Sequence, residues 1–174
     1  CFMAEAVDMA RRARSRTWPN PPVAAVVVAG RVIVGRGAHE GPGKPHAEPA
    51  ALADAGEAAR GATLYVTLEP CNHQGRTPPC APAVVSAGVS RVVVGIRDPN
   101  PTVIGGGCRF LRDRGLDVTC GVMADEALDL IWPFVATDNF THAYVQLKTA
   151  HSLDGWFAPP AAAREATAPV YLSG

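Results

Sequence analysis

The chain has 174 residues, of which 48% are hydrophobic and 18% charged, and its formal net charge is zero. This length and composition favour one globular domain of ordinary size over a disordered segment. The balanced charge argues against nucleic acid or an anionic membrane as a partner, and no apolar run is long enough to span a bilayer.

The N-terminal part predicts a helix followed by a hairpin. Residues 4–16 carry apolar side chains at helical spacing, and the prolines that follow end the helix. Val23–Val28 predicts a buried strand, which turns at Ala29-Gly30 and returns over residues 31–35. Asn20 lies in the proline-rich loop before this strand, where an ordinary turn residue is the simplest interpretation.

A second helix is expected from about His46 to Ala59, and it begins with His46-Ala47-Glu48. The positive end of this helix should help to keep Glu48 ionised. The run Thr63–Leu68 predicts a strand that leads into Pro70-Cys71. After eight further residues, Cys80 opens a short predicted helix.

His46, Cys71 and Cys80 together predict a catalytic zinc site. One imidazole and two thiolates make three protein ligands, the number a catalytic zinc uses when its fourth position is kept for water. Glu48 would take the proton of that water and later protonate a leaving amine. Zinc deaminases share this order of His-x-Glu, Pro-Cys and a second Cys. Taken singly, the cysteines could instead form a disulfide or be buried thiols.

The spacing of the two cysteines departs from the general deaminase signature. That signature has two residues between its cysteines, whereas this chain has eight. The second sulfur has only to return to the same point, so zinc can still be held. The longer loop must therefore cover something other than the metal, and what it covers should affect which substrate can bind.

The second half of the chain continues the alternation of strands and helices. Strands are predicted over residues 91–96, 116–122 and 143–150, and helices over residues 104–114 and 124–136. This order predicts an α/β protein with a central sheet covered by helices on both faces.

Localisation is expected to be cytoplasmic. The first sixteen residues have their basic side chains after the apolar ones, the reverse of a secretory signal. Five cysteines, an odd number, do not suggest a secreted disulfide framework. With two assigned to zinc, Cys1, Cys108 and Cys120 are expected to be free thiols.

Seven motifs match one known family. They are Pro19-Asn20-Pro21, Gly37-Ala38-His39, His46-Ala47-Glu48, Thr67–Cys71, His73, Gly75–Cys80 and Asp98–Pro101. Residues 4–122 resemble, over nearly their whole length, the deaminase domain of the bifunctional riboflavin biosynthesis deaminase–reductase, in the cytidine deaminase-like superfamily. The long loop that ends in Thr-Pro-Pro-Cys is typical of that branch.

The resemblance implies a three-layer α/β/α sandwich with a central mixed sheet. It also implies one zinc per chain and hydrolysis of 2,5-diamino-6-ribosylamino-4(3H)-pyrimidinone 5′-phosphate to 5-amino-6-ribosylaminouracil 5′-phosphate and ammonia. The substrate-binding residues that it implies are Asn20, His39, His73, Arg76, Asp98 and Asn100. Arg76 would meet the phosphate as a bidentate donor, and Asp98 and Asn100 would contact the ribose or the ring.

Three residues, at two places in the chain, depart from the family pattern and keep other functions open. Ala24 stands where the family usually has Gly and would narrow the pocket floor, and Pro49-Ala50 replaces a Val-His-like pair. A different amino-pyrimidine or purine in a specialised, antibiotic-type pathway is therefore an alternative substrate. A further alternative is a non-catalytic, zinc-stabilised binding subunit. Glu48 argues against it, because a structural zinc would recruit a fourth protein ligand.

The C-terminal part resembles the opening strand of the family's reductase domain, over Tyr144–Gly155. We therefore expect a deaminase domain over residues 1–142 and a remnant of the reductase start with a tail over residues 143–174. No NADPH binding is expected, and a separate reductase or a longer chain would supply the reduction. The resemblance also suggests a dimer or tetramer. Trp132, Phe134 and Phe140 are candidates for an apolar contact between copies, or for ordinary packing.

Overall fold

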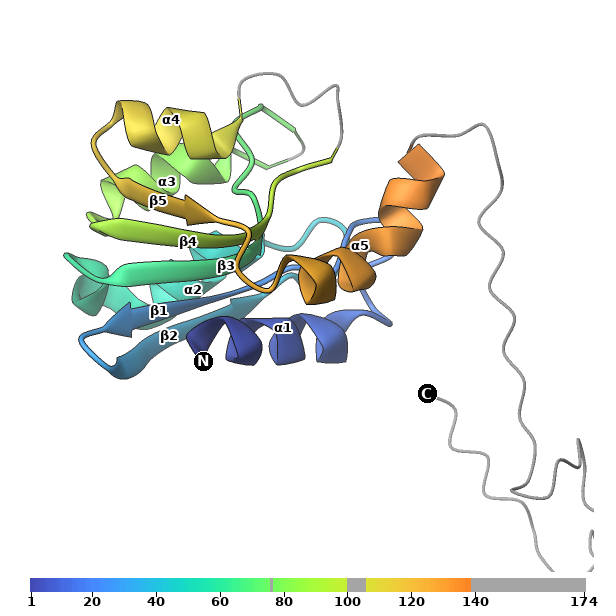
Figure 1. Cartoon of the computed structure of the whole chain (residues 1–174), viewed down its shortest axis with the longest axis horizontal. Helices are drawn as coiled ribbons and strands as arrows, with labels where there is room; N and C mark the ends of the chain where they lie inside the picture. Colours follow the sequence, from blue (N-terminus) through green and yellow to red (C-terminus); the bar gives the residue numbers. More distant parts are fainter. Residues whose placement is uncertain (76, 100–105, 139–174) are drawn as a thin grey trace, which may run out of the picture. The chain divides into compact units, whose positions relative to one another are not determined.

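The computed structural model describes residues 1–75, 77–99 and 106–138. Within these ranges, helices and strands alternate around one five-stranded sheet (Figure 1). The strands are β1 (Ala24–Ala29), β2 (Val32–Ala38), β3 (Thr63–Leu68), β4 (Arg91–Ile96) and β5 (Asp117–Cys120). The helices are α1 (Phe2–Ala13), α2 (Ala47–Ala55), α3 (Cys80–Ser86), α4 (Gly107–Asp113) and α5 (Ala124–Asp138).

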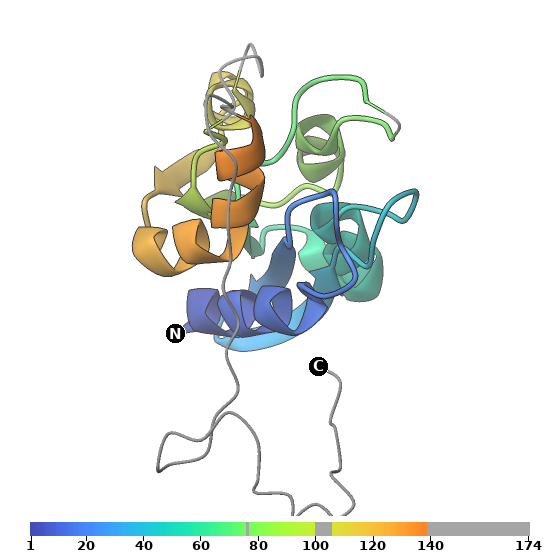
Figure 2. The ribbon, with the colours of Figure 1, turned by 90° about the vertical axis from the view of Figure 1, so that its right-hand side faces the viewer.

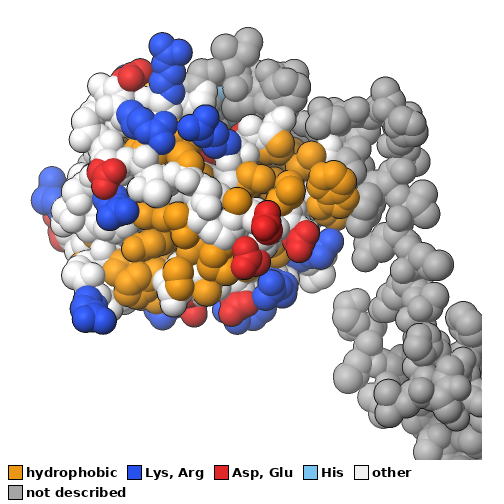
Figure 3. Space-filling view, in the orientation of Figure 1, with side chains coloured by type: hydrophobic (Ala, Val, Ile, Leu, Met, Phe, Trp, Pro, Cys, Tyr) orange, Lys and Arg blue, Asp and Glu red, His pale blue; other side chains and the backbone are white. Residues whose placement is uncertain are grey.

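Several predicted features lie outside the described residues. They are Arg76, Asn100, Phe140, the strand over residues 143–150 and the domain boundary after residue 142. Among the described helices, none has the length and apolar character needed to cross a membrane. On the face drawn in Figure 3, basic and acidic side chains both occur among apolar ones, as the zero net charge leads one to expect.

The sheet is mixed, with strand order β2-β1-β3-β4-β5. β1 is antiparallel to both β2 and β3, whereas β3, β4 and β5 run parallel to one another. The antiparallel pair β1–β2 is joined by a tight turn at Gly30, whose φ of +62° suits glycine. The parallel strands are connected through α3 and α4. The loops that follow β3 and β4 therefore leave the same edge of the sheet.

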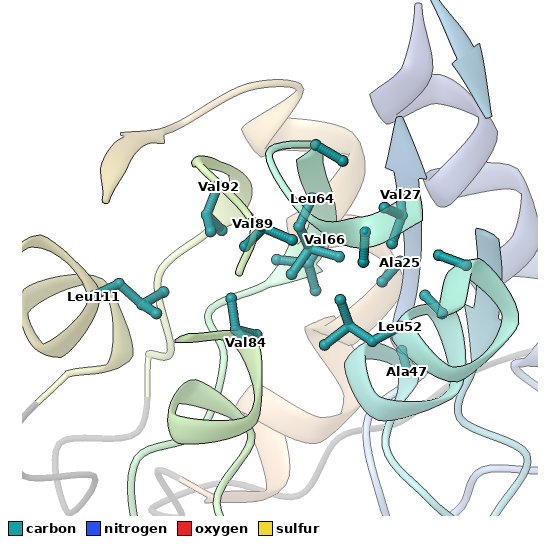
Figure 4. Close-up of a cluster of buried hydrophobic side chains, with 14 of the residues drawn as sticks. Ala25, Val27, Ala47, Leu52, Leu64, Val66, Val84, Val89, Val92 and Leu111 are labelled. Carbon is teal, nitrogen blue, oxygen red and sulfur yellow. The ribbon is translucent and has the colours of Figure 1, made fainter. Parts of the chain in front are cut away.

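Helices cover both faces of the sheet, which makes the fold a three-layer α/β/α sandwich. α1 and α5 lie on one face, and α2 and α3 lie on the other (Figures 1 and 2). β1 is buried on both faces, and its successive side chains point to opposite sides. Val27 therefore packs with Leu64 and Val66 beneath α2 and α3 (Figure 4), while Val26 packs against α1.

Strand β2 extends beyond its predicted end at residue 35 and continues to Ala38. Glycine is typical of loops, so the local pattern favours a strand end before Gly37. The structure gives another reason for the glycines of this strand, because α2 packs directly on it. A Cβ on Gly37 would lie 2.3 Å from the backbone nitrogen of Ala51, and one on Gly35 would lie 2.3 Å from the backbone oxygen of the same residue.

The second helix is shorter than predicted. α2 ends at Ala55, and Gly56–Ala59 forms a 3-10 turn instead. The cause is Gly56, whose φ of +53° lies in the left-handed region where helices end. α2 still forms with Pro49 in its first turn, a position where proline is tolerated.

Candidate metal and active site

Three side chains from different elements meet at one edge of the sheet. His46 caps the N-terminus of α2, Cys71 follows β3, and Cys80 is the first residue of α3. Their ligand atoms all lie within 4.8 Å of one another. The Nδ1 atom of His46 is 3.2 Å from the sulfur of Cys80 and 3.6 Å from that of Cys71. The three residues predicted as metal ligands are therefore adjacent, and Nδ1 is the imidazole atom that faces the two sulfurs.

The chemistry and spacing of these atoms fit zinc. A tetrahedral zinc with Zn–S of about 2.3 Å and Zn–N of about 2.0 Å sets its nitrogen and sulfur ligands about 3.5 Å apart. The observed separations of 3.2 and 3.6 Å agree with that value within a few tenths of an ångström. Among the described residues, no fourth His, Cys, Asp or Glu joins the group. The cluster thus matches the ligand count of a catalytic rather than a structural zinc.

The two thiols and the imidazole are coupled through hydrogen bonds. The interaction with Cys80 lowers the pKa of Cys71 to about 4, and the same interaction raises the pKa of Cys80. The backbone N–H of Cys80 also donates to the sulfur of Cys71, at 3.3 Å. A hydrogen bond with Cys71 raises the pKa of His46. These groups share protons that a divalent cation would displace.

Glu48 lies in the first turn of α2, two residues after His46, and only 4% of it is exposed. Burial raises its pKa to about 7, and hydrogen bonding to its own backbone amide offsets that rise only in part. The backbone at the helix N-terminus favours the ionised form, as expected, but desolvation outweighs this effect and the net pKa shift is upward. A carboxyl with a pKa near neutrality can both accept and return a proton.

The far side of the His46 imidazole faces Thr77. The hydroxyl oxygen of Thr77 lies 3.3 Å from Nε2 of His46. If Nδ1 binds a metal ion, Nε2 carries the proton and donates it to this hydroxyl. Partners of this kind fix the tautomer and orientation of metal-binding histidines. In the sequence, Thr77 is noticed only as one residue of the motif Gly75–Cys80.

A pocket of about 520 Å³ opens beside the cluster. Besides His46, Glu48 and Cys71, four of the six predicted substrate-binding residues line it: Asn20, His39, His73 and Asp98. The other two, Arg76 and Asn100, lie outside the described residues. Lining residues that the sequence analysis did not single out include Lys44, Glu69 and Phe134. Phe134, a candidate for subunit contact or packing, also contributes to this pocket.

Asn20 and His39 form a hydrogen-bonded pair on the pocket wall. The Nδ2 atom of Asn20 is 2.9 Å from Nε2 of His39, and Nδ1 of His39 is 3.0 Å from the carbonyl oxygen of Pro45. A carbonyl can only accept, so Nδ1 carries the proton and Nε2 accepts one from Asn20. The backbone N–H of Asn20 also donates to the carbonyl of Thr17, at 2.8 Å, as in a turn. Asn20 is therefore a turn residue whose side-chain orientation is set by His39.

Glu69 connects the two loops at this edge. Its carboxylate accepts the backbone N–H of Asp98 at 3.1 Å and that of Cys108 at 2.7 Å. It thereby joins the segment before Cys71 to the loop after β4 and to the start of α4. No pattern within the sequence could identify these partners, because they lie 29 and 39 residues away.

The two departures from the family pattern lie away from the pocket wall. Ala24 is fully buried among the side chains beneath α1, and its backbone N–H donates to the hydroxyl of Thr67 at 3.2 Å. Neither Ala24 nor Pro49 is among the residues that line the pocket. Ala24 was expected to narrow the pocket floor, but its side chain does not line the pocket.

Comparison with known proteins identifies the family. Residues 1–96 match the model of the cytidine and deoxycytidylate deaminase zinc-binding region. The chain belongs to this deaminase family. Riboflavin biosynthesis protein RibD of Escherichia coli (strain K12) is 47% identical over 174 residues, which cover 94% of this chain and 47% of that protein. The chain thus spans about half the length of that relative.

A shorter relative and two solved structures agree with the assignment. The diaminohydroxyphosphoribosylamino-pyrimidine deaminase of Buchnera aphidicola subsp. Acyrthosiphon pisum (strain APS) is 46% identical over 126 residues, covering 72% of this chain and 86% of the relative. RibD of Acinetobacter baumannii, form 1, superposes with a TM-score of 0.80 and 47% identity, over 88% of this chain and 43% of that chain.

The second structure is the Thermotoga maritima diaminohydroxyphosphoribosylaminopyrimidine deaminase/5-amino-6-(5-phosphoribosylamino)uracil reductase. It superposes with a TM-score of 0.74 and 43% identity, over 79% of this chain and 40% of that chain. The predicted resemblance to riboflavin-pathway deaminase domains, the mixed α/β/α fold and zinc as the metal of this family are therefore confirmed.

Proposed function

We propose that this zinc deaminase converts 2,5-diamino-6-ribosylamino-4(3H)-pyrimidinone 5′-phosphate to 5-amino-6-ribosylaminouracil 5′-phosphate and ammonia. The observation that carries the proposal is the set of three ligand atoms beside a buried Glu48 at the wall of a pocket. The 46% identity to a deaminase of this name, over most of that relative, supports this substrate.

His46, Cys71 and Cys80 would hold one zinc per chain, which when bound supplies a water of lowered pKa. The carboxylate of Glu48 accepts the proton of the attacking water. It then donates a proton to the departing nitrogen at C2 of the substrate. One C–O bond forms and one C–N bond breaks: the oxygen of the water stays on C2 as the ring carbonyl, and the amine leaves as ammonia.

The pocket side chains orient the ring for this attack. Asn20, whose amide is positioned by His39, has donor and acceptor atoms for the heterocycle. His73 and Asp98 line the same pocket and supply further polar contacts. Arg76 and Asn100 complete the proposed set, with Arg76 directed to the phosphate, although both lie outside the described residues.

The localisation, oligomeric state and partners of the enzyme are also part of the proposal. We expect a cytoplasmic homodimer or homotetramer that acts on a small pyrimidine nucleotide without nucleic acid or membrane as a partner. We expect no NADPH binding by residues 1–142. A reduction of the product would then be carried out elsewhere, in a separate reductase or in a longer chain.

Ammonia release from the pyrimidinone phosphate, with zinc measured on the same sample, tests the proposal. Turnover with about one zinc per chain is the expected result. Zinc without turnover of this compound, but with turnover of another amino-pyrimidine or purine, would replace the substrate and retain the chemistry. Zinc without release of ammonia from any of these amines would favour the binding-subunit alternative.

A further inference from the structure

Two thiols that the deaminase site does not use face each other between α4 and β5. Cys108 lies in the first turn of α4, and Cys120 is the last residue of β5. Their sulfurs are 3.2 Å apart, and neither cysteine is in a disulfide. We propose that Cys108 and Cys120 are a redox-active pair that hydroperoxides oxidise to a reversible disulfide.

The geometry needs little change for the bond to form. A disulfide has an S–S length of about 2.0 Å, so the sulfurs must approach each other by roughly 1.2 Å. Cys108 is held in place, because its backbone N–H donates to Glu69 at 2.7 Å. Cys120 stands at a strand end and is followed by Gly121, whose φ is +91°. The adjustment therefore falls to Cys120 rather than to the start of α4.

The two cysteines have different surroundings, which assign them different roles. Cys120 is partly exposed, and its sulfur accepts a hydrogen bond from Nη2 of Arg112 at 3.4 Å. Hydrogen bonding to Cys120 is also the main cause of a raised pKa at Arg97. Basic side chains gather over α4 in Figure 3, and Arg109 and Arg112 on that helix are exposed. Partially exposed sulfurs in such electropositive surroundings are the ones that react with oxidants.

Cys108 has the character of the second, resolving thiol. Only 2% of it is exposed, so a peroxide reaches Cys120 first. Burial raises the pKa of Cys108, which keeps it protonated until the reaction. A metal-binding role for the pair is disfavoured, since among the described residues no third His, Cys, Asp or Glu forms a three-ligand group with these two sulfurs.

The reaction balances with hydrogen peroxide as the oxidant. The sulfur of Cys120 attacks one peroxide oxygen, so that an S–O bond forms, the O–O bond breaks and the first water leaves. The sulfur of Cys108 then attacks the sulfenic sulfur, so that the S–S bond forms, the S–O bond breaks and a second water leaves with the Cys108 proton. Two thiols are oxidised by two electrons in all, and one peroxide is reduced to two waters.

Peptide mapping of the zinc-loaded protein after treatment with stoichiometric hydrogen peroxide tests the proposal. Trypsin cuts between the two cysteines, at Arg109, Arg112 and Arg114, and so separates residues 98–109 from residues 115–148. We expect these two peptides to be linked, about 2 Da lighter than their sum, and to separate on reduction. The loss of two thiols should leave the zinc content unchanged.

Single variants separate the two roles, with Cys1→Ser as a matched control that should leave the link intact. In Cys108→Ser, dimedone should trap a sulfenic acid on Cys120. In Cys120→Ser, Cys108 should stay unmodified because it is buried. Oxidation of Cys120 to a sulfinic acid without a link would overturn the proposal, as would a Cys71–Cys80 link with loss of zinc. The mapping uses the unaltered chain, so it holds even where a variant folds poorly.

Discussion

The hydroxyl of Thr77 lies 3.3 Å from Nε2 of His46, on the opposite side of the imidazole from the two cysteine sulfurs. In the zinc-bound form that we propose, this contact would keep the proton on Nε2 and leave the lone pair of Nδ1 for the metal. Thr77→Ala should therefore lower zinc affinity about 10- to 100-fold, the usual effect of losing such a partner. Competition with a chromogenic chelator measures it. Thr77→Ser keeps the hydroxyl and should bind zinc nearly as the parent does; equal losses in both variants would contradict the role.

Glu48→Gln should lower kcat for ammonia release by about 10²- to 10⁴-fold, the range for loss of a general acid–base. Zinc content should not change, because Glu48 is not in the ligand group. Steady-state kinetics and metal analysis on one preparation check both parts. Glu40→Gln, at an exposed carboxylate, is the control and should be neutral. Full ammonia release by a zinc-loaded Glu48→Gln protein would rule out the proposed mechanism.

The hydrogen bond between Asn20 and His39 predicts coupled effects of their substitution. If His39 serves to orient the Asn20 amide, Asn20→Ala and His39→Ala should each weaken substrate binding, and the double variant should lose little more than the worse single one. The coupling free energy expected for such a pair is about 0.5–3 kcal/mol. Values of KM from a double-mutant cycle measure it. Independent, additive losses would show that the two side chains act separately.

Glu69 is expected to stabilise the edge of the sheet at which the site lies. Its carboxylate accepts two backbone N–H groups, from Asp98 and Cys108. Glu69→Gln replaces one acceptor with a donor and should lower the free energy of unfolding by about 1–3 kcal/mol. Urea unfolding monitors the change. Glu57→Gln, at a side chain 95% exposed, should alter stability by less than about 0.5 kcal/mol. Similar values for the two variants would argue against this role.

The close packing of α2 on β2 predicts that Gly37 cannot be enlarged without cost. The added methyl group of Gly37→Ala would meet the backbone of Ala51 at 2.3 Å, so α2 would have to move. We expect a loss of about 1–3 kcal/mol in the free energy of unfolding, as for other overpacked sites. Thermal unfolding tests it against Val32→Ala, at a side chain 65% exposed on the same strand. An unchanged Gly37→Ala protein would mean that the two elements can separate freely.

The sequence alone predicted His46, Cys71 and Cys80, which the structure brings together as a group able to hold a metal ion, because residue chemistry and order along the chain carry that information. It also predicted β3 and β4 to the residue, since apolar, β-branched runs are local features. Local patterns gave the wrong end for two elements. Glycine at Gly37 suggested a loop where β2 continues, and the pattern missed the end of α2 before Gly56, whose φ is positive.

The tertiary structure decided which side chains meet. The pairs Asn20–His39, His46–Thr77 and Cys108–Cys120 are separated by 19, 31 and 12 residues. Their contacts depend on the strand order β2-β1-β3-β4-β5 and on parallel strands that deliver their loops to one edge. The chain carries no periodic signal for such pairs, because each arises only when elements formed independently pack against a common sheet.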